Sequence, residues 1–348
     1  MVRSRNNYYS GCRLMASRAR KTAAQASYQQ GERKNFFYNG DMAICQRSTS
    51  VSGLGNGDSN YHVQDRYKFA VAGAPNAIVT MSQSTTAPDG FFHSMKFDCT
   101  TASGTVAAGD LVYFSQIFEG LDLLHIKKGT AQARALTVSF WVNTTKTGTY
   151  IVSMYDNDNA RSCSQAYTVS SSDTWEYKTV TFPPDTTGAY DNDNAASLYV
   201  HWGLVAGTDW TSGTLATAWQ SNVSADQFTG QVDAFDSTDN NFHITGIQME
   251  LGNTATDFQY ELYADNLERC KRYFISYAGT KYGQRYSTSA GFVNIEFPRR
   301  MRASPTIQSY SAVRTTTGLG YYPNARHWQV LMTATNPYIS TVLLSADL

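Results

Sequence analysis

The chain has 348 residues, and its 28 lysines and arginines balance 28 aspartates and glutamates. Hydrophobic residues make up 42% of it, enough for a sizeable core, whereas charged residues reach only 16%. No run of 18 apolar residues occurs, and no apolar segment follows the basic N-terminus. We therefore expect neither insertion into a membrane nor a signal peptide.

The balanced net charge conceals three zones of opposite sign. Residues 1–34 carry eight basic side chains and one acidic side chain, a net charge of +7. Residues 35–265 carry ten basic and 24 acidic side chains, a net charge of −14, and residues 266–348 return to +7. This asymmetry predicts that the two ends and the acidic body face different partners.

Residues 1–34 are predicted to form an extended basic arm, because they have no sustained apolar face and cannot build a core of their own. We expect the arm to dock on the acidic surface of another protein. Nucleic acid is not the expected partner, since the acidic body would repel its phosphates. The side chains expected to make this anchor are Arg3, Arg5, Tyr8, Tyr9, Arg13, Arg18, Arg20 and Lys21.

Residues 35–260 are predicted to be all-β. Apolar and polar residues alternate over 136–142, 176–182 and 242–251, and turn-rich segments separate these runs. In the second run, the alternation is expected to turn Tyr177 and Thr179 inward. Strands that no long helix interrupts favour antiparallel sheets, so this region should fold as a β-sandwich.

A helix is predicted to follow over residues 261–276. Tyr263, Leu267, Cys270 and Phe274 recur at spacings of one helical face, and charged residues occupy the other face. Short strand patterns return after it. Residues 277–348 are therefore predicted to form a small C-terminal β domain.

No motif in the chain indicates a metal, a cofactor or a catalytic centre. The five cysteines include no Cys-x-x-Cys pair, so we expect reduced thiols rather than a zinc site. The sequence Tyr-Asp-Asn-Asp-Asn-Ala occurs at 155–160 and again at 190–195, but turns explain it more simply than calcium loops do. Catalytic signature motifs are also missing, and we expect no enzyme activity.

The turn-rich segment 185–241 combines aromatic rings with carboxylates and amides. Such side chains can stack on sugar rings and bind sugar hydroxyls. The residues expected to bind a glycan are Tyr190, Asp191, Asp193, Trp210 and Trp219. The competing interpretation is that these aromatic residues belong to the core, where Trp202 is expected.

Several blocks along the chain resemble a known module. They are, in order, 37–50 (FYNGDMAICQRSTS), 116–120 (QIFEG), 136–142 (LTVSFWV), 175–178 (WEYK), 244–252 (ITGIQMELG), 268–274 (ERCKRYF) and 297–306 (FPRRMRASPT). In this order they resemble the carbohydrate-binding-like jelly roll, with its connecting helix and small C-terminal β domain, of tail-fibre and appendage proteins of tailed bacteriophages.

The resemblance implies a jelly-roll β-sandwich in a non-catalytic structural protein of the virion, assembled in the bacterial cytoplasm. The arm would then anchor the chain to other virion proteins, and the chain would form a homo-oligomer, preferably a trimer. One expected role is display of the sandwich to a host-surface glycan. The alternative is a capsid or tail decoration or fibre-base protein whose sandwich only packs. A polysaccharide depolymerase is a more distant alternative.

Overall fold

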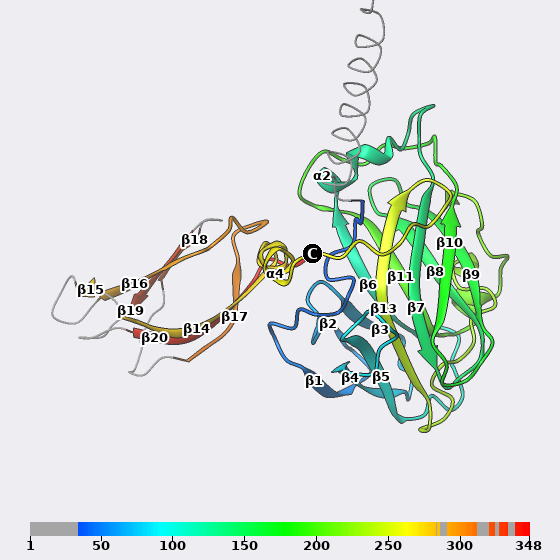
Figure 1. Cartoon of the computed structure of the whole chain (residues 1–348), viewed down its shortest axis with the longest axis horizontal. Coiled ribbons are helices and arrows are strands. Elements are labelled where there is room, and N and C mark those ends of the chain that lie inside the picture. Colours follow the sequence, from blue (N-terminus) through cyan, green and yellow to red (C-terminus); the bar gives the residue numbers. More distant parts are fainter. Residues whose placement is uncertain (1–33, 283, 286–290, 312–319, 324–326, 333–337) are drawn as a thin grey trace, which may run out of the picture.

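The computed structural model describes all residues except 1–33, 283, 286–290, 312–319, 324–326 and 333–337 (Figure 1). The arm predicted over 1–34, with all eight of its expected anchor residues, therefore lies outside the described residues except for Lys34. Four cysteines are described, Cys45, Cys99, Cys163 and Cys270, and all four are free thiols. No described helix is long and apolar enough to cross a bilayer.

The body is a jelly-roll sandwich of two antiparallel sheets, which confirms the predicted fold (Figure 1). The six-stranded sheet has the order β1 (Ser50–Leu54), β4 (Ile78–Ser84), β5 (Ser94–Thr101), β13 (Asn241–Leu251), β7 (Leu136–Thr144) and β10 (Glu176–Phe182). The seven-stranded sheet has the order β12 (Gln220–Ser221), β9 (Arg161–Val169), β8 (Gly148–Asp156), β11 (Ala196–Ala206), β6 (Leu111–Glu119), β3 (Lys68–Ala72) and β2 (Ser59–Tyr61).

Aromatic rings fill the space between the sheets. Trp202 on β11 is fully buried, stacks on Phe114 with ring centroids 5.1 Å apart, and meets Phe140 of the opposite sheet edge-on at 5.9 Å. Burying each such ring stabilises the fold by about 1.5–3 kcal/mol. The prediction that Trp202 belongs to the core is confirmed.

The inward positions predicted for β10 are wrong. Tyr177 is 43% exposed and Thr179 is also exposed, whereas Val180 and Phe182 are buried in the core. The pairing of β10 with β7 explains the error, because Val180 lies opposite the buried Val138 and must share its face. Tyr177 instead packs outside, beside Trp141.

The connecting helix α4 (Tyr263–Cys270) is shorter than the range predicted for it, because the chain turns at 271–273 and enters strand β14 at Phe274. Its sandwich-facing residues are Asn266 and Cys270, while Tyr263 is 62% exposed. Asn266 accepts a hydrogen bond from the backbone N–H of Asn39. Of the predicted apolar face, Cys270 and Phe274 are therefore buried and Tyr263 is not, and the polar Asn266 adds a contact that the sequence interpretation did not include.

Two small sheets follow, and Figure 1 places them to one side of the sandwich with α4 at the junction. One has the order β14 (Phe274–Tyr282), β20 (Tyr338–Ser345) and β17 (Thr306–Ser311). The other has the order β15 (Gln284–Arg285), β16 (Gly291–Glu296), β19 (His327–Met332) and β18 (Gly320–Pro323). We refer to residues 274–348 as the C-terminal module.

Short helical turns lie in the loops that cap the sandwich. They are α2 (Gly120–Leu123), η1 (Leu124–Ile126), α3 (Thr208–Thr211) and η2 (Ser224–Asp226). The loop 207–232, which contains the last two, crosses the outer face of the seven-stranded sheet. Its Phe228 is buried there with Leu111 and Ile151, and Trp210 packs against this cluster.

His243 on β13 predicts how stability depends on pH. Burial, aided by nearby Lys96, lowers the pKa of His243 from 6.5 to about 4. The unfolded chain therefore binds this proton near pH 6.5, and the folded chain only near pH 4. The stability due to neutral His243 is complete above pH 6.5 and is lost as the pH falls toward 4.

We expect the melting temperature of His243→Gln to fall less than that of the wild type between pH 7.5 and pH 4.5, because glutamine does not titrate. Differential scanning calorimetry at the two pH values measures both differences. His125→Gln, at an exposed position in η1, should retain the wild-type acid sensitivity. Equal acid sensitivity of His243→Gln and the wild type would contradict the assignment.

Candidate functional site

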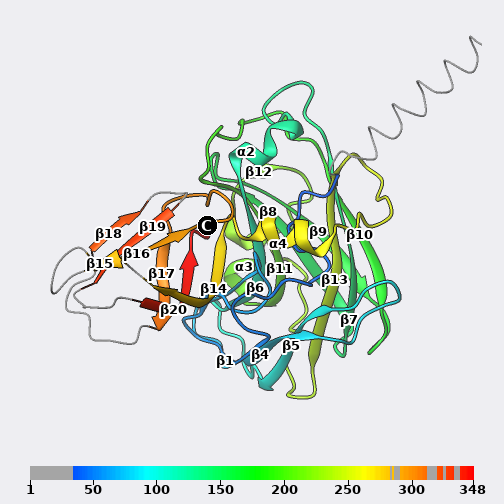
Figure 2. The ribbon, with the colours of Figure 1, turned by 60° about the vertical axis from the view of Figure 1, so that its left-hand side comes forward.

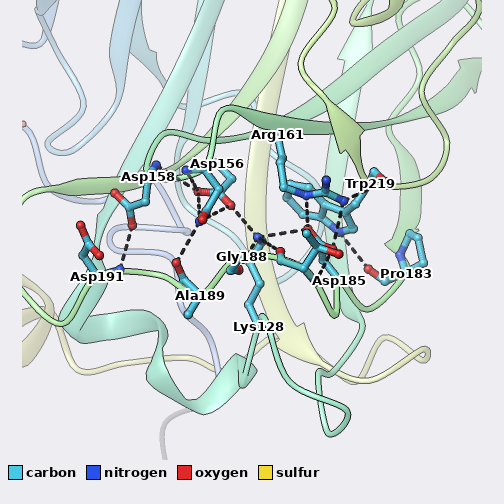
Figure 3. Close-up of polar contacts among 12 residues, drawn as sticks. Lys128, Asp156, Asp158, Arg161, Pro183, Asp185, Gly188, Ala189, Asp191 and Trp219 are labelled. Carbon is cyan, nitrogen blue, oxygen red and sulfur yellow. Dashed lines mark hydrogen bonds and ion pairs between the residues drawn. The ribbon is translucent and has the colours of Figure 1, made fainter.

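The predicted binding residues Tyr190 and Trp219 both lie beside one buried lysine, Lys128. The Lys128 side chain is 2% exposed, and its Nζ lies 2.5 Å from Asp156 Oδ2 and 3.0 Å from Asp185 Oδ2 (Figure 3). It also donates hydrogen bonds to the backbone carbonyls of Thr187 and Gly188, both at 2.8 Å. The rings of Tyr190 and Trp219 have centroids 5.3 and 5.5 Å from Nζ. We call this arrangement the Lys128 cluster.

Arg161 also belongs to the Lys128 cluster, because it pairs with Asp185. Its Nε and Nη2 donate to the two carboxylate oxygens of Asp185, at 2.8 and 3.1 Å. Burial alone would raise the pKa of Asp185, but hydrogen bonds from Arg161, Thr187 and Lys128 hold that pKa below its usual value. Every charged group in the cluster thus has a partner within the protein.

The two Asp-Asn-Asp-Asn sequences lie side by side next to this cluster (Figure 3). The backbone N–H of Asp191 donates to Asp158 Oδ2 at 2.9 Å, and Asn159 Nδ2 donates to the carbonyl of Ala189. Gly188, with a φ of +70°, permits this approach, because a Cβ there would lie 2.4 Å from the Asn159 side-chain oxygen. The repeated sequences therefore form two interlocked turns.

The five predicted residues do not form one open site. Tyr190 is 9% exposed and belongs to the core, while Trp219 is partly buried against it and donates to the carbonyl of Pro183 at 2.9 Å. Asp191 and Asp193 are exposed near them. Trp210 lies elsewhere, on the outer face of the seven-stranded sheet. In the part of the chain that the structure describes, no three metal-ligating side chains gather as they would around an ion.

A second set of aromatic side chains gathers on that outer face, and the sequence interpretation did not select it. On β11, Leu198, Val200 and Trp202 point into the core, so Tyr199 and His201 point outward. Tyr155 on β8 and Tyr113 on β6 lie next to them. Ring centroids are 6.0 Å apart for Tyr155 and Tyr199, 5.7 Å for Tyr199 and His201, and 4.8 Å for His201 and Tyr113. All four side chains are partly exposed, and we call them the aromatic strip.

Strand register places polar residues next to the aromatic strip, and the serines among them are buried. One row of cross-strand neighbours runs through six strands, each residue opposite the next, as Tyr61, Lys68, Ser115, His201, Ser153 and Ser164. The five steps between strands give this row a length of about 24 Å, at roughly 4.8 Å a step. The next row over contains Ile117, Tyr199, Tyr155 and Ser162.

The electrostatics of the strip are simple. Burial, with Lys68 nearby, lowers the pKa of His201 to about 3, so this imidazole is neutral at physiological pH. Its Nδ1 has no hydrogen-bond partner among the described residues. The four strands β3, β6, β8 and β11 carry two carboxylates, Glu119 and Asp156. Arg272 pairs with Glu119 and Lys128 with Asp156, so neither is a free charge on the strip.

One local pattern could have revealed the strip. A half-buried strand usually has polar residues at outward positions, yet β11 has Tyr199 and His201 there, and β8 has Tyr155. Aromatic residues at the outward positions of two strands indicate a surface used for contact. The pairing of these strands, which brings the rings together, is visible only in the fold.

No protein-family model matches the chain, and no curated protein matches it. Solved structures resemble it weakly. The enzymatically active domain of bacteriophage CBA120 tailspike protein 4 shares 14% identity, with 58% of this chain and 21% of that chain covered and a TM-score of 0.30. This chain therefore spans about a fifth of that tailspike structure.

Two carbohydrate-binding modules resemble the chain to a similar degree. TmCBM61, solved in complex with β-1,4-galactotriose, shares 8% identity over 63% of this chain and 99% of its own, with a TM-score of 0.30. The family 11 module of the cellulase Lic26A-Cel5E of Clostridium thermocellum shares 10% identity over 60% and 99%, with a TM-score of 0.29. Likeness at this level carries no argument about ligand or role, which depends on the site itself.

Proposed function

We propose that this chain is a non-catalytic virion protein of a tailed bacteriophage, a fibre or appendage subunit, which holds a host-surface polysaccharide against the aromatic strip. The observation that carries the glycan-binding part is the strip itself: three tyrosines and a neutral histidine, all partly exposed on one face of the seven-stranded sheet. Tyrosine rings can stack on the C–H faces of sugars, and tyrosine hydroxyls can hydrogen-bond sugar hydroxyls.

The virion part of the proposal depends on the resemblance of the sequence blocks to phage appendage proteins. It includes assembly in the bacterial cytoplasm, a homotrimer, and attachment to other virion proteins through residues 1–34. The rival role, a decoration or fibre-base protein with a purely structural sandwich, differs in one respect, because it predicts no glycan affinity.

A non-catalytic role is favoured by the carboxylates near the strip. Glycoside hydrolysis ordinarily needs two carboxyl groups that flank the scissile bond, about 5–10 Å apart. Glu119 and Asp156 are held by Arg272 and Lys128 instead. Reducing sugar released from host polysaccharide by the purified protein would contradict this part of the proposal.

Replacement of Tyr199 by alanine tests the binding face. We expect Tyr199→Ala to weaken binding to host-cell polysaccharide by about fivefold, since one ring stacked on a sugar contributes about 1 kcal/mol. Binding of the purified protein to immobilised polysaccharide measures the effect. Tyr177→Ala is the matched control, because Tyr177 is exposed on the outer face of the opposite sheet.

The two variants separate the competing roles. Wild-type and Tyr177→Ala proteins should bind alike, and both variants should melt near the wild-type temperature. If Tyr177→Ala loses binding and Tyr199→Ala keeps it, the strip is not the binding face. If the wild type binds no polysaccharide extracted from a host that the phage infects, the structural role replaces the proposed one.

A further inference from the structure

Lys68 is the one cation in the polar row beside the aromatic strip. It lies between Tyr61 on β2 and Ser115 on β6, and Ser115 in turn lies opposite His201. Its charge is therefore two strand steps from His201, at roughly 4.8 Å a step. A ligand stacked on Tyr199 or Tyr113 would extend within reach of its ammonium group.

Lys68 has no carboxylate partner within ion-pairing distance in the described part of the chain, although it is partly buried. Asp347 is near enough to favour the charged form, but Arg47 already pairs with Asp347. Burial is the larger influence and lowers the pKa of Lys68. The ammonium has thus lost hydration without gaining a full counter-ion in the protein.

The aromatic strip itself carries no charged side chain. His201 is neutral, Ser115 is uncharged, and the hydroxyl of Tyr61 donates to the backbone carbonyl of Leu348 at 2.9 Å. The nearest carboxylate on a neighbouring strand, Glu119, accepts hydrogen bonds from Arg272 and from the Tyr273 hydroxyl. Lys68 is therefore a positive charge beside the stacking rings that Asp347 stabilises from a distance but that no carboxylate of the described residues pairs with directly.

We infer that the glycan bound on this face is acidic, and that the carboxylate of a uronic-acid sugar pairs with Lys68 while the sugar ring stacks on the aromatic strip. This inference rests on the proposed glycan-binding function and deepens it by assigning the ligand class. A carboxylate would give the ammonium of Lys68 the ion-pair partner that it does not have among the described residues.

The test compares glucuronate with glucose, which differ at one carbon, by ligand-observed NMR titration of the full chain at low salt. We expect the wild type to bind glucuronate at least about tenfold more tightly than glucose. Lys68→Met should abolish this preference, because its affinity for glucuronate should fall to its affinity for glucose. Lys96→Met is the matched control, because it removes a partly exposed lysine from β5 of the opposite sheet, and it should keep the preference.

The possible outcomes separate the inference that the ligand is acidic from the proposal that the face binds a glycan at all. If the wild type binds both sugars equally, or if Lys68→Met keeps the preference, the acidic assignment is overturned while the glycan-binding function stands. If Tyr199→Ala leaves glucuronate binding intact, the anion binds elsewhere and the assignment also fails. If neither sugar binds, the glycan-binding function fails with it. Acetate, which has the carboxylate without a ring, should bind much more weakly than glucuronate.

Discussion

Lys128→Met is expected to lower the free energy of unfolding by about 3–5 kcal/mol, the cost of removing one partner from a buried ion pair. The variant leaves the carboxylates of Asp156 and Asp185 buried with fewer partners, since their side chains are at most 4% exposed. It also removes the donor that Thr187 and Gly188 share. Methionine fills similar space, so the loss reports charge pairing rather than a cavity.

Urea denaturation of the variant beside the wild type measures this loss. Lys178→Met is the control, because Lys178 pairs with Glu176 at a site where both side chains are more exposed. Surface pairs contribute about 0–1 kcal/mol, so the control should unfold near the wild-type midpoint. Equal midpoints for Lys128→Met and Lys178→Met would show that the Lys128 cluster does not hold the sandwich together.

The Lys128 cluster bears on the residues that the sequence proposed for binding. Tyr190 and Trp219 flank a lysine whose charge is already matched, and Trp219 also donates to a backbone carbonyl. Aromatic and acidic side chains in turn-rich sequence fit a glycan site and a buried polar cluster equally well. What separates the two is exposure, which depends on how loops far apart in sequence pack together.

Where the alternation of apolar and polar residues alone decides burial, the sequence predicted the strands and their buried residues correctly. The runs over 136–142 and 242–251 became strands β7 and β13, with Val138, Phe140 and Ile244 in the core. Strand β10 alternates just as regularly, yet the wrong face was chosen, because both faces contain an aromatic or apolar residue. Only the partner strand distinguishes them.

The aromatic strip could not be assembled from the sequence for a related reason. Lys68, beside the strip, is on β3, and His201, within the strip, is on β11. These two strands lie on either side of β6 in the sheet, although more than a hundred residues separate Lys68 from His201 in the chain. Their proximity follows from a jelly-roll strand order that interleaves distant segments. Propensity and periodicity are local quantities and carry no information about register across six strands.

Glu119→Ala is expected to detach the C-terminal module from the sandwich. The Glu119 side chain is 1% exposed, and it accepts hydrogen bonds from Arg272 Nε at 2.9 Å and from the Tyr273 hydroxyl. The Tyr273 ring in turn lies under the buried guanidinium of Arg66, 3.4 Å from its centroid. Alanine leaves both donors without their acceptor at the junction between α4 and β14.

Because Arg272 keeps partial contact with water, the cost should fall near the low end of about 3–5 kcal/mol. We expect limited proteolysis to cut Glu119→Ala between residues 252 and 274 at a protease dose that leaves the wild type intact. Among the described residues, the Glu119 side chain accepts hydrogen bonds from Arg272 and Tyr273 and from no sandwich strand, so the sandwich fragment should survive. Asp122→Ala is the control, since Asp122 accepts a hydrogen bond from the Tyr38 hydroxyl and, among the described residues, none from Arg272 or Tyr273. A wild-type digestion pattern for Glu119→Ala would mean that the other contacts at this junction, such as Arg47 stacked on Phe274 at 3.6 Å, hold the module without it.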